Sequence, residues 1–452
     1  MSVSILSGIS YFRISFLTFQ AVIQVVLVCF SGYVAAKYDL LDSKTMTKIS
    51  KLNVFIFTPA LIFIKLASDL SLKKIIELII VPIFFVAFLL VSLISSKIVS
   101  RFLNFNEPET NYITALTVFG NSFSLPVSII MSLAYTLPNL KWDRITNDNS
   151  DQIASRGILY LLIFHQLGQC LRWSWGYNTL MKKRSFNELY HINDSNSSSN
   201  EEFIHQHLVN QFDSESIKSN NSRNTNNHSH RALTESDPLL ITHTSHNSAD
   251  NYGINNNNNN NTWITKLKTV AISVINYLNP PLVAMIFALV VSLTSFLKYQ
   301  FYEKNGFFQN TVSSAIAQLG SVSIPLVLLV LGGTLYPSNE IPPATPYYRR
   351  IIIGAIISRM VLPAFILLPS ISILIKYFTF LSPNLSDPIF LIVAFMLTVA
   401  PPALQISQIC QINEIYQKEM AGVLFWAYVV FTLPVVVLIV LVSLRVLSWA
   451  NN

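Results

Sequence analysis

Residues 119–129, FGNSFSLPVSI, place a helix-breaking stretch inside an apolar run that is long enough to cross a membrane. Pro126 has no backbone N–H, and in a helix its ring clashes with the carbonyl group four residues earlier. In hydrocarbon, broken backbone is tolerated only where it is buried in protein or lines a cavity. A second such stretch, APPALQISQ at 400–408, lies in another apolar run. Two interrupted spans in corresponding positions of two halves indicate a transporter substrate site.

The composition predicts a membrane protein. Of the 452 residues, 52% are hydrophobic and only 12% are charged, whereas a soluble domain has about 25% charged residues. We therefore expect a multi-pass integral membrane protein whose permanent partner is the lipid bilayer. Lysine and arginine mostly flank the apolar runs, as membrane topology demands. No basic run with interleaved aromatic residues points to nucleic acid as a partner.

The sequence carries no motif for catalysis or for a cofactor. It has no glycine-rich phosphate loop ending in lysine, no HExxH and no GxSxG. Cys29, Cys170 and Cys410 all fall in apolar runs, so we expect small buried hydrophobic residues rather than a disulfide or a metal set. The chain is therefore predicted not to be an enzyme and to bind no cofactor or metal.

Ten apolar runs have the length of about 20 residues that a transmembrane helix needs. Five precede a long polar segment and five follow it. The runs are 16–36, 49–67, 79–99, 112–135, 157–180, 270–297, 313–336, 351–377, 389–411 and 423–447.

The polar segment is rich in asparagine, serine, histidine and acidic residues. It has too few apolar residues to form a core and is expected to be disordered. Its histidines match no known spacing of metal ligands. The predicted organisation is a first transmembrane repeat at 1–181, a polar loop at 182–265 and a second transmembrane repeat at 266–452.

Five spans on each side of a loop indicate a duplication. Because five is odd, the second half must cross the membrane in the opposite sense, and the repeats are inverted about an axis in the membrane plane. The distribution of lysine and arginine favours a cytoplasmic loop. The predicted fold class is an all-α polytopic membrane protein with ten transmembrane helices in two inverted five-helix repeats, of which helices 4 and 9 are broken and cross.

With GNSFSLPVSI in the fourth span and APPALQISQI in the ninth, the chain resembles the auxin efflux carrier family. That family includes the plant PIN and PIN-like carriers and their fungal relatives. The stretch SGYVAAKYDLLDSKTMTKISKLNVFIFTPALIFIKLAS is similar to its opening segment. NPPLVAMIFALVVS and AGVLFWAYVVFTLPVVV are similar to its sixth and tenth spans. The asparagine tract and the serine-rich loop are typical of a fungal member.

The resemblance implies two five-helix bundles, a scaffold and a transport bundle, with alternating access by an elevator movement. Helices 4 and 9 of the transport bundle would cross at their breaks. The implied crossover residues are Gly120, Pro126, Pro401 and Pro402. The resemblance also favours the endoplasmic reticulum membrane, with the plasma or vacuolar membrane as alternatives, and suggests a homodimer.

The half-helices that begin after the two breaks would carry unpaired N–H groups and the positive ends of their dipoles. Such ends suit an anion, and nearby amides and hydroxyls could complete the site. The candidate substrate-binding residues are Asn121, Ser122, Ser124, Gln405 and Ser407. Alternatively, the two amides only satisfy backbone groups that the prolines free. Plant carriers that bind auxin have an asparagine near the second crossover, whereas the nearest amide here is Gln405, so the resemblance leaves the substrate open.

Ionisable residues inside a span are functional candidates. A histidine near the middle of the fifth span could carry a coupled proton, or it could be neutral and hydrogen-bonded between helices. The candidate proton or polar relay is His165, Gln166 and Gln169. Arg172 lies near the cytoplasmic end of its span and could snorkel toward the membrane surface. Arg359 needs a partner or a wet cavity, and Glu414 is the candidate partner.

The leading functional hypothesis is a secondary transporter or facilitator of a small organic anion, an auxin-like carboxylate by resemblance. The alternative is a non-transporting membrane sensor or scaffold that acts through its cytoplasmic loop. A channel fits less well, because broken helices indicate a binding site rather than a continuous pore.

Overall fold

The computed structural model describes residues 11–69, 78–136, 140–142, 144–145, 148–185, 188–189, 278–302, 306–337 and 344–451. All of them belong to one compact unit to which both apolar halves of the chain contribute. Most of the loop expected at 182–265 lies outside the described residues, so its disorder stays a prediction.

All named secondary-structure elements of the described residues are helices. The β-pairing found among these residues is a single bridge. The first half contains α2 (Tyr11–Lys37), α3 (Ser43–Leu52), η1 (Asn53–Phe57), α4 (Thr58–Asp69), α6 (Ile80–Phe102), α7 (Glu107–Val118), α8 (Ser124–Thr136), α9 (Ser150–Leu171) and η3 (Arg172–Leu180).

The second half begins with α13 (Pro280–Leu293), α14 (Ser295–Tyr302), η4 (Gln309–Ser313), α15 (Ser314–Leu335), α16 (Tyr348–Ile356), η5 (Ile357–Val361) and α17 (Leu362–Tyr377). After two short 3₁₀ turns it continues with α18 (Pro388–Val399), α19 (Gln405–Asn413), α20 (Gln417–Phe425), η8 (Trp426–Phe431) and α21 (Thr432–Asn451).

By length and composition, 5 helices of the described residues can each cross a membrane. They correspond to the expected second, third, seventh, eighth and tenth spans and run over Ser43–Ala67, Ile80–Phe102, Gln309–Leu335, Tyr348–Tyr377 and Gln417–Ala450. This confirms an all-helical multi-pass membrane protein in the described part. The full set of ten spans and their inverted symmetry stay predictions.

Of the five remaining expected spans, the first is the continuous helix α2, whose apolar part, Ile23–Lys37, is short, and the other four depart from a straight apolar helix in different ways. The fourth is divided into α7 and α8 and the ninth into α18 and α19. The sixth is bent by 102° between α13 and α14. The fifth, α9 followed by η3, carries several polar and charged side chains, which lower its hydropathy.

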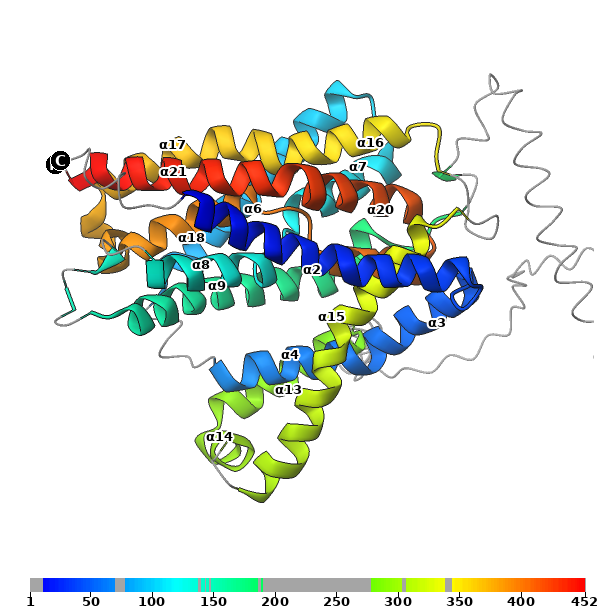
Figure 1. Cartoon of the computed structure of the whole chain (residues 1–452), viewed down its shortest axis with the longest axis horizontal. Coiled ribbons are helices and arrows are strands. Elements are labelled where there is room, and N and C mark those ends of the chain that lie inside the picture. Colours follow the sequence, from blue (N-terminus) through cyan, green and yellow to red (C-terminus); the bar gives the residue numbers. More distant parts are fainter. Residues whose placement is uncertain are drawn as a thin grey trace, which may run out of the picture. The chain divides into compact units, whose positions relative to one another are not determined.

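Two sets of helices can be followed in Figure 1. In the first set, α15 packs along α2 and α4, and α13 also packs along α4. In the second set, α9 contacts α6, α8 and α18, while α18 also contacts α17 and α21. The first set thus takes the first two expected spans of each half, and the second set takes the last three. This grouping differs from the expected two bundles of five helices.

The breaks in the fourth and ninth spans pair with each other. Gly120 and Pro402 form an antiparallel bridge. The amide of Asn121 donates to the carbonyl oxygen of Pro401 at 2.7 Å, and the amide of Ala403 donates to that of Phe119 at 2.8 Å. Each unwound segment therefore supplies hydrogen bonds that the other has lost, as buried backbone requires.

Arg359, on η5, satisfies carbonyl groups that this crossing leaves open. Its Nη1 donates to Thr117 O at 2.8 Å, its Nη2 to Leu397 O at 3.3 Å and its Nε to Ala400 O at 2.8 Å. A continuous helix would pair Thr117 O with the amide of Asn121, which is directed to Pro401 instead. Leu397 O would need an N–H at Pro401, which proline lacks.

Gly120 leaves the space that this guanidinium occupies. A Cβ atom at position 120 would overlap the Nη2 atom of Arg359. The Arg359 side chain is only 1% exposed, and its guanidinium also lies 4.9 Å from the centre of the Phe88 ring. The crossing therefore requires a residue without a side chain at position 120.

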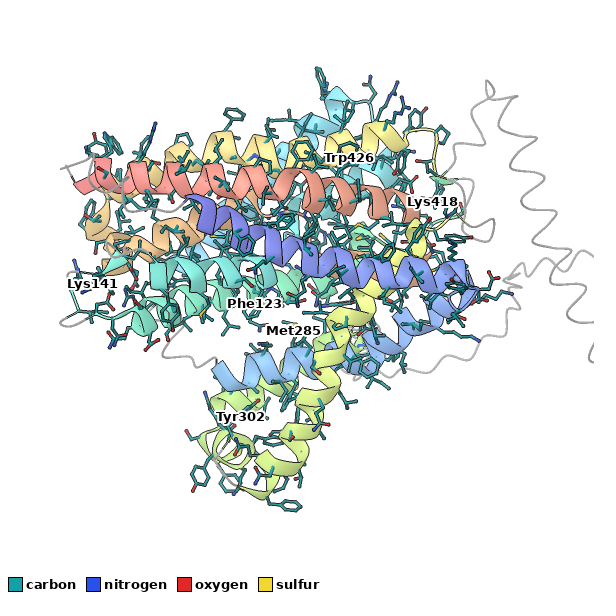
Figure 2. All side chains as sticks on the ribbon, viewed as in Figure 1. Phe123, Lys141, Met285, Tyr302, Lys418 and Trp426 are labelled. Carbon is teal, nitrogen blue, oxygen red and sulfur yellow. The ribbon has the colours of Figure 1, made fainter. Side chains whose placement is uncertain are left out.

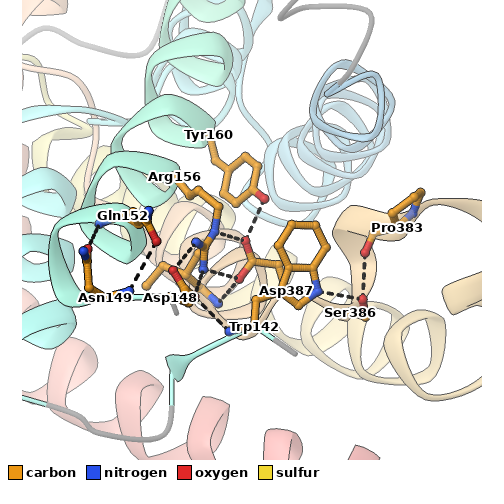
Figure 3. A network of polar contacts seen from close by, with 10 residues as sticks. Trp142, Asp148, Asn149, Gln152, Arg156, Tyr160, Pro383, Ser386 and Asp387 are labelled. Carbon is orange, nitrogen blue, oxygen red and sulfur yellow. Dashed lines mark hydrogen bonds and ion pairs between the residues drawn. The ribbon is translucent and has the colours of Figure 1, made fainter. Parts of the chain in front are cut away.

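A second network joins the halves at one end of the crossing helices (Figure 3). Arg156 on α9 makes ion pairs with Asp148 at 2.8 Å and with Asp387, the N-cap residue of α18, at 2.9 Å. Tyr160 donates to Asp387 at 2.8 Å. Trp142 donates from its amide to Asp148 at 2.9 Å and from its indole to Ser386 at 3.0 Å. The network ties the start of α9 to the start of α18.

Replacement of Gly120 by alanine is expected to destabilise the protein by about 1–3 kcal/mol, the usual cost of overpacking. Thermal unfolding of the purified protein in detergent measures this as a lower melting temperature. Gly168→Ala is the matched control, because a Cβ there would meet Phe85 at an ordinary 3.9 Å and alanine favours a helix over glycine. Equal melting temperatures for the two variants would contradict the description of the crossing.

Asp148→Asn is expected to lower the melting temperature at pH 7, because a hydrogen bond to a charged group is worth about 1.5–3 kcal/mol. The hydrogen bond from Arg156 lowers the pKa of Asp148. The contribution of the Asp148 carboxylate to the free energy of unfolding is therefore complete above its unfolded-state pKa of about 3.9. This contribution is lost as the pH falls through the lower pKa of the folded state.

The difference in melting temperature between wild type and Asp148→Asn should accordingly shrink when the pH is taken from 7 to 3. Asp387 is present in both proteins, so its own titration cancels in the comparison. Asp39→Asn, at an exposed position with positive φ, is the control and should leave the melting temperature unchanged. A difference that stays constant over this pH range would disprove the role given to the Asp148 carboxylate.

Candidate functional site

The structure places the first break before Pro126 rather than at it. The unwound residues are 119–123, and Pro126 is the third residue of α8. Proline is tolerated in a first turn, because the N–H groups there have no partner within the helix. In the ninth span the unwound residues are 400–404, so Pro401 and Pro402 both lie inside the break.

Asn121 is held by the tenth span. Its Nδ2 donates to the hydroxyl oxygen of Tyr428 at 2.7 Å, and that hydroxyl donates to Pro402 O at 3.1 Å. Asn121 Oδ1 accepts from the amide of Phe123 at 3.4 Å. In this conformation the Asn121 side chain satisfies groups of the crossing itself, which was the alternative considered for it.

Ser122 lies against the fifth span. Its Oγ is 2.9 Å from His165 Nδ1, and His165 Nε2 is 3.1 Å from Gln169 Nε2. Gln169 Oε1 accepts from Trp173 Nε1 and from Arg172 Nη1, both at 3.1 Å. Two donors on Oε1 fix the orientation of the Gln169 amide, so its Nε2 must donate to His165. His165 is therefore neutral here, with its proton on Nδ1 directed at Ser122.

Arg172 stands at the end of this chain of contacts, as the first residue of η3. Its Nη1 also donates to Oε1 of Gln405, the first residue of α19. The guanidinium lies 5.7 Å from the centre of the Phe119 ring, and its buried Nε has no hydrogen-bond partner. The side chain is only 1% exposed, so Arg172 is buried in protein and does not snorkel.

The two buried arginines differ in how their charges are balanced. Arg359 binds the carbonyl ends of α7 and α18, where each helix dipole places about half a negative charge. Arg172 donates to Gln405, the first residue of α19, where the helix dipole is positive. Among the described side chains, no carboxylate pairs with either arginine. Of these two arginines, Arg172 is therefore the one whose positive charge is not balanced by a negative helix end or by a described carboxylate.

The other candidate residues lie at or beside this centre in different roles. Ser407 donates to Leu404 O at 2.7 Å within its own helix turn. Gln166 is buried, and its Oε1 has no partner. The backbone of Ser124 begins α8, and its side chain lies outside what the structure describes. Their proposed participation in binding or relay stays a prediction.

Glu414 is not the partner of Arg359. It makes an ion pair with Lys183 at 2.8 Å, and both side chains are exposed. Arg359 finds its partners among backbone carbonyl groups, which the sequence does not reveal because they depend on where the chain is unwound.

Tyr428 and the central position of Arg172 were missed by sequence reasoning. Arg172, Arg359 and Tyr428 all lie in π-helical segments, η3, η5 and η8. A π turn adds a residue to the helix and shifts which side chains face inward, and it often occurs at functional sites. An arginine inside an apolar span was the available signal for Arg172. No sequence pattern marks the π turn that directs Tyr428 inward.

Comparison with known proteins shows which family the chain is similar to. The model of a family described as membrane transport protein matches residues 17–439. An uncharacterized transporter of Saccharomyces cerevisiae is 46% identical over 442 residues, which cover 98% of each chain. An uncharacterized transporter of Schizosaccharomyces pombe is 34% identical over 95% of each chain.

A plant relative is similar at lower identity. Protein PIN-LIKES 7 of Arabidopsis thaliana is 23% identical over 423 residues, which cover 92% of this chain and 94% of the plant protein. The resemblance to the auxin efflux carriers is thereby confirmed. The chain belongs to the membrane transport protein family of PIN and PIN-like carriers, and its similar fungal relatives are named as transporters.

Proposed function

We propose that this membrane transporter carries a small organic anion and binds it at the crossing of the fourth and ninth spans. The observation that carries the proposal is the buried guanidinium of Arg172. It has an unpartnered Nε and no carboxylate partner among the described side chains. A buried charge without compensation is costly, and an anionic substrate would supply both the missing charge and the missing acceptor.

The surroundings of Arg172 suit a carboxylate in particular. A guanidinium offers N–H groups in a planar fork that matches two carboxylate oxygens. Gln405 uses its Oε1 to accept from Arg172, which leaves its Nε2 available as a further donor. The N-terminus of α19 adds its positive end. Displacement of the Arg172–Gln405 hydrogen bond by the substrate would couple binding to the position of α19.

We further propose that the chain works by elevator-type alternating access with inverted five-helix repeats. The support is the grouping of the helices, in which the first two spans of each half form one set and the last three form the other. Equivalent spans, the fourth and ninth, are broken and pair antiparallel. In this proposal the second set carries the crossing past the first set.

The driving force in this proposal is the membrane potential. Moving one charge through 100 mV is worth about 2.3 kcal/mol without any coupled ion. His165 is hydrogen-bonded on both ring nitrogens as a neutral residue, so it does not hold a transferable proton in this conformation. A role for His165, Gln166 and Gln169 as a polar relay would require a second conformation in which Gln169 releases His165.

The proposed membrane is that of the endoplasmic reticulum, and a homodimer is the proposed assembly, both by resemblance to the family. An auxin-like carboxylate is the first substrate to test on the same ground. The alternative function, a sensor or scaffold that acts through the polar loop, needs neither the unpaired guanidinium nor the crossing.

Saturable uptake of radiolabelled indole-3-acetate into vesicles that contain the purified protein, under an imposed potential, tests the proposal. Arg172→Gln is expected to reduce uptake at least tenfold, equivalent to about 1.4 kcal/mol or more. Gln405→Ala should raise the KM for indole-3-acetate and reduce uptake less than Arg172→Gln does. Arg101→Gln, at an exposed position of α6, is the matched control. Saturable uptake that survives in Arg172→Gln, with the variant folded by gel filtration, would refute the site.

Removal of the polar loop distinguishes the two functions. A chain that lacks residues 191–265, rejoined by a short glycine-serine linker, is expected to keep wild-type uptake because the described unit is formed without these residues. The sensor alternative predicts the reverse pattern in cells, with the deletion variant inactive and Arg172→Gln fully active. That reverse pattern would transfer the function to the loop.

A further inference from the structure

A third cation lies near the crossing and belongs to the other helix set. Lys65 is on α4, and its side chain is exposed. Its ammonium group lies 5.1 Å from the centre of the Phe123 ring. Among the described side chains, no hydrogen bond or ion pair accounts for its charge.

A continuous series of contacts connects this exposed ammonium to the buried guanidinium. The half-buried Phe123 ring lies 5.2 Å, centre to centre, from the ring of His165. His165 contacts Gln169, and Gln169 accepts from Arg172. Figure 2 shows Phe123 on the side of the second helix set that faces α4, the helix that carries Lys65.

We propose that Lys65, Phe123 and His165 form an access subsite through which the anion passes on its way to Arg172. The inference rests on the proposed function and adds to it a second binding position. The Lys65 ammonium receives the carboxylate, and the Phe123 ring receives the apolar body of the same molecule. The subsite thus selects monoanions that have a negative group at one end and an apolar surface at the other.

The chemistry of the two cations fits a sequence of weak and then strong binding. Lysine is a compact, strongly hydrated charge on a flexible stem, whereas arginine binds carboxylate through a fixed fork. An exposed ion pair is weak, so an anion held by Lys65 can leave it readily. Lys65 also belongs to the first helix set and Arg172 to the second, so relative movement of the sets would separate the two positions.

Transport kinetics test the subsite in vesicles made of phosphatidylcholine alone, in which no anionic lipid competes for Lys65. Lys65→Met is expected to raise the KM for indole-3-acetate about two- to fivefold with little change in kcat, and to flatten the rise of KM with ionic strength. Lys65→Arg should restore both. An unchanged KM and salt dependence in Lys65→Met would overturn the proposal. An effect seen only when anionic lipid is added would also overturn it and assign Lys65 to lipid headgroups.

A second measurement does not depend on the transported substrate. Lys65→Cys, in a background with Cys29 and Cys170 replaced by serine, is labelled with negatively and positively charged methanethiosulfonate reagents. The rate of labelling by the negative reagent is divided by the rate of labelling by the positive reagent. This ratio should exceed the same ratio measured for 2-mercaptoethanol at least about threefold, because Arg172 favours the anionic reagent. Absence of labelling, or a ratio equal to that of the free thiol, would disprove an anion-accessible subsite.

The two measurements separate this inference from the function on which it rests. Selective labelling together with no saturable uptake by wild type would keep the subsite and refute indole-3-acetate as the substrate. Saturable uptake that depends on Arg172 but not on Lys65, together with unselective labelling, would keep the function and refute the subsite.

Discussion

The guanidinium of Arg359 holds the centre of this protein together. It binds three carbonyl groups at the ends of two half-helices. Two of these carbonyl groups lack the amide that a continuous helix would give them, one because the chain is unwound at Asn121 and the other because Pro401 has no N–H. In a membrane interior those carbonyls would otherwise be unsatisfied. The antiparallel bridge between Gly120 and Pro402 can therefore form inside the protein without water to satisfy these carbonyl groups. Gly120 provides the space that the guanidinium of Arg359 occupies.

The two buried arginines, Arg359 and Arg172, have different surroundings in this arrangement. The helix ends that meet Arg359 are negative and balance its charge, whereas the helix end that Arg172 meets through Gln405 is positive. The fold uses Arg359, and the proposed function uses Arg172 to bind the anion. Because Gln405 connects Arg172 to the start of α19, an anion bound at Arg172 would act directly on one arm of the crossing. The proposed alternating-access mechanism requires such a coupling.

The sequence predicted the parts of this arrangement that depend on local chemistry. Apolar runs and prolines marked the spans and the two breaks, because their effects on a helix are independent of the rest of the fold. The partners across the breaks could not be predicted. Arg359 binds backbone atoms rather than the expected Glu414, and Tyr428 reaches Asn121 through a π turn. Such contacts depend on long-range packing, and the position of Pro126 after its break reflects the tolerance of a first helical turn for proline.

Hydrogen–deuterium exchange of the peptides that contain Asn121 and Ala403 tests the crossing most directly. These amides lie outside regular helix but donate across the bridge, so the wild-type protein in nanodiscs should protect them as strongly as the neighbouring helices. In Arg359→Lys the ammonium cannot reach all three carbonyl groups with a planar fork, and exchange at both peptides should become faster by at least about tenfold. Rapid exchange in the wild type, or equal exchange in the two proteins, would contradict a crossing held by Arg359.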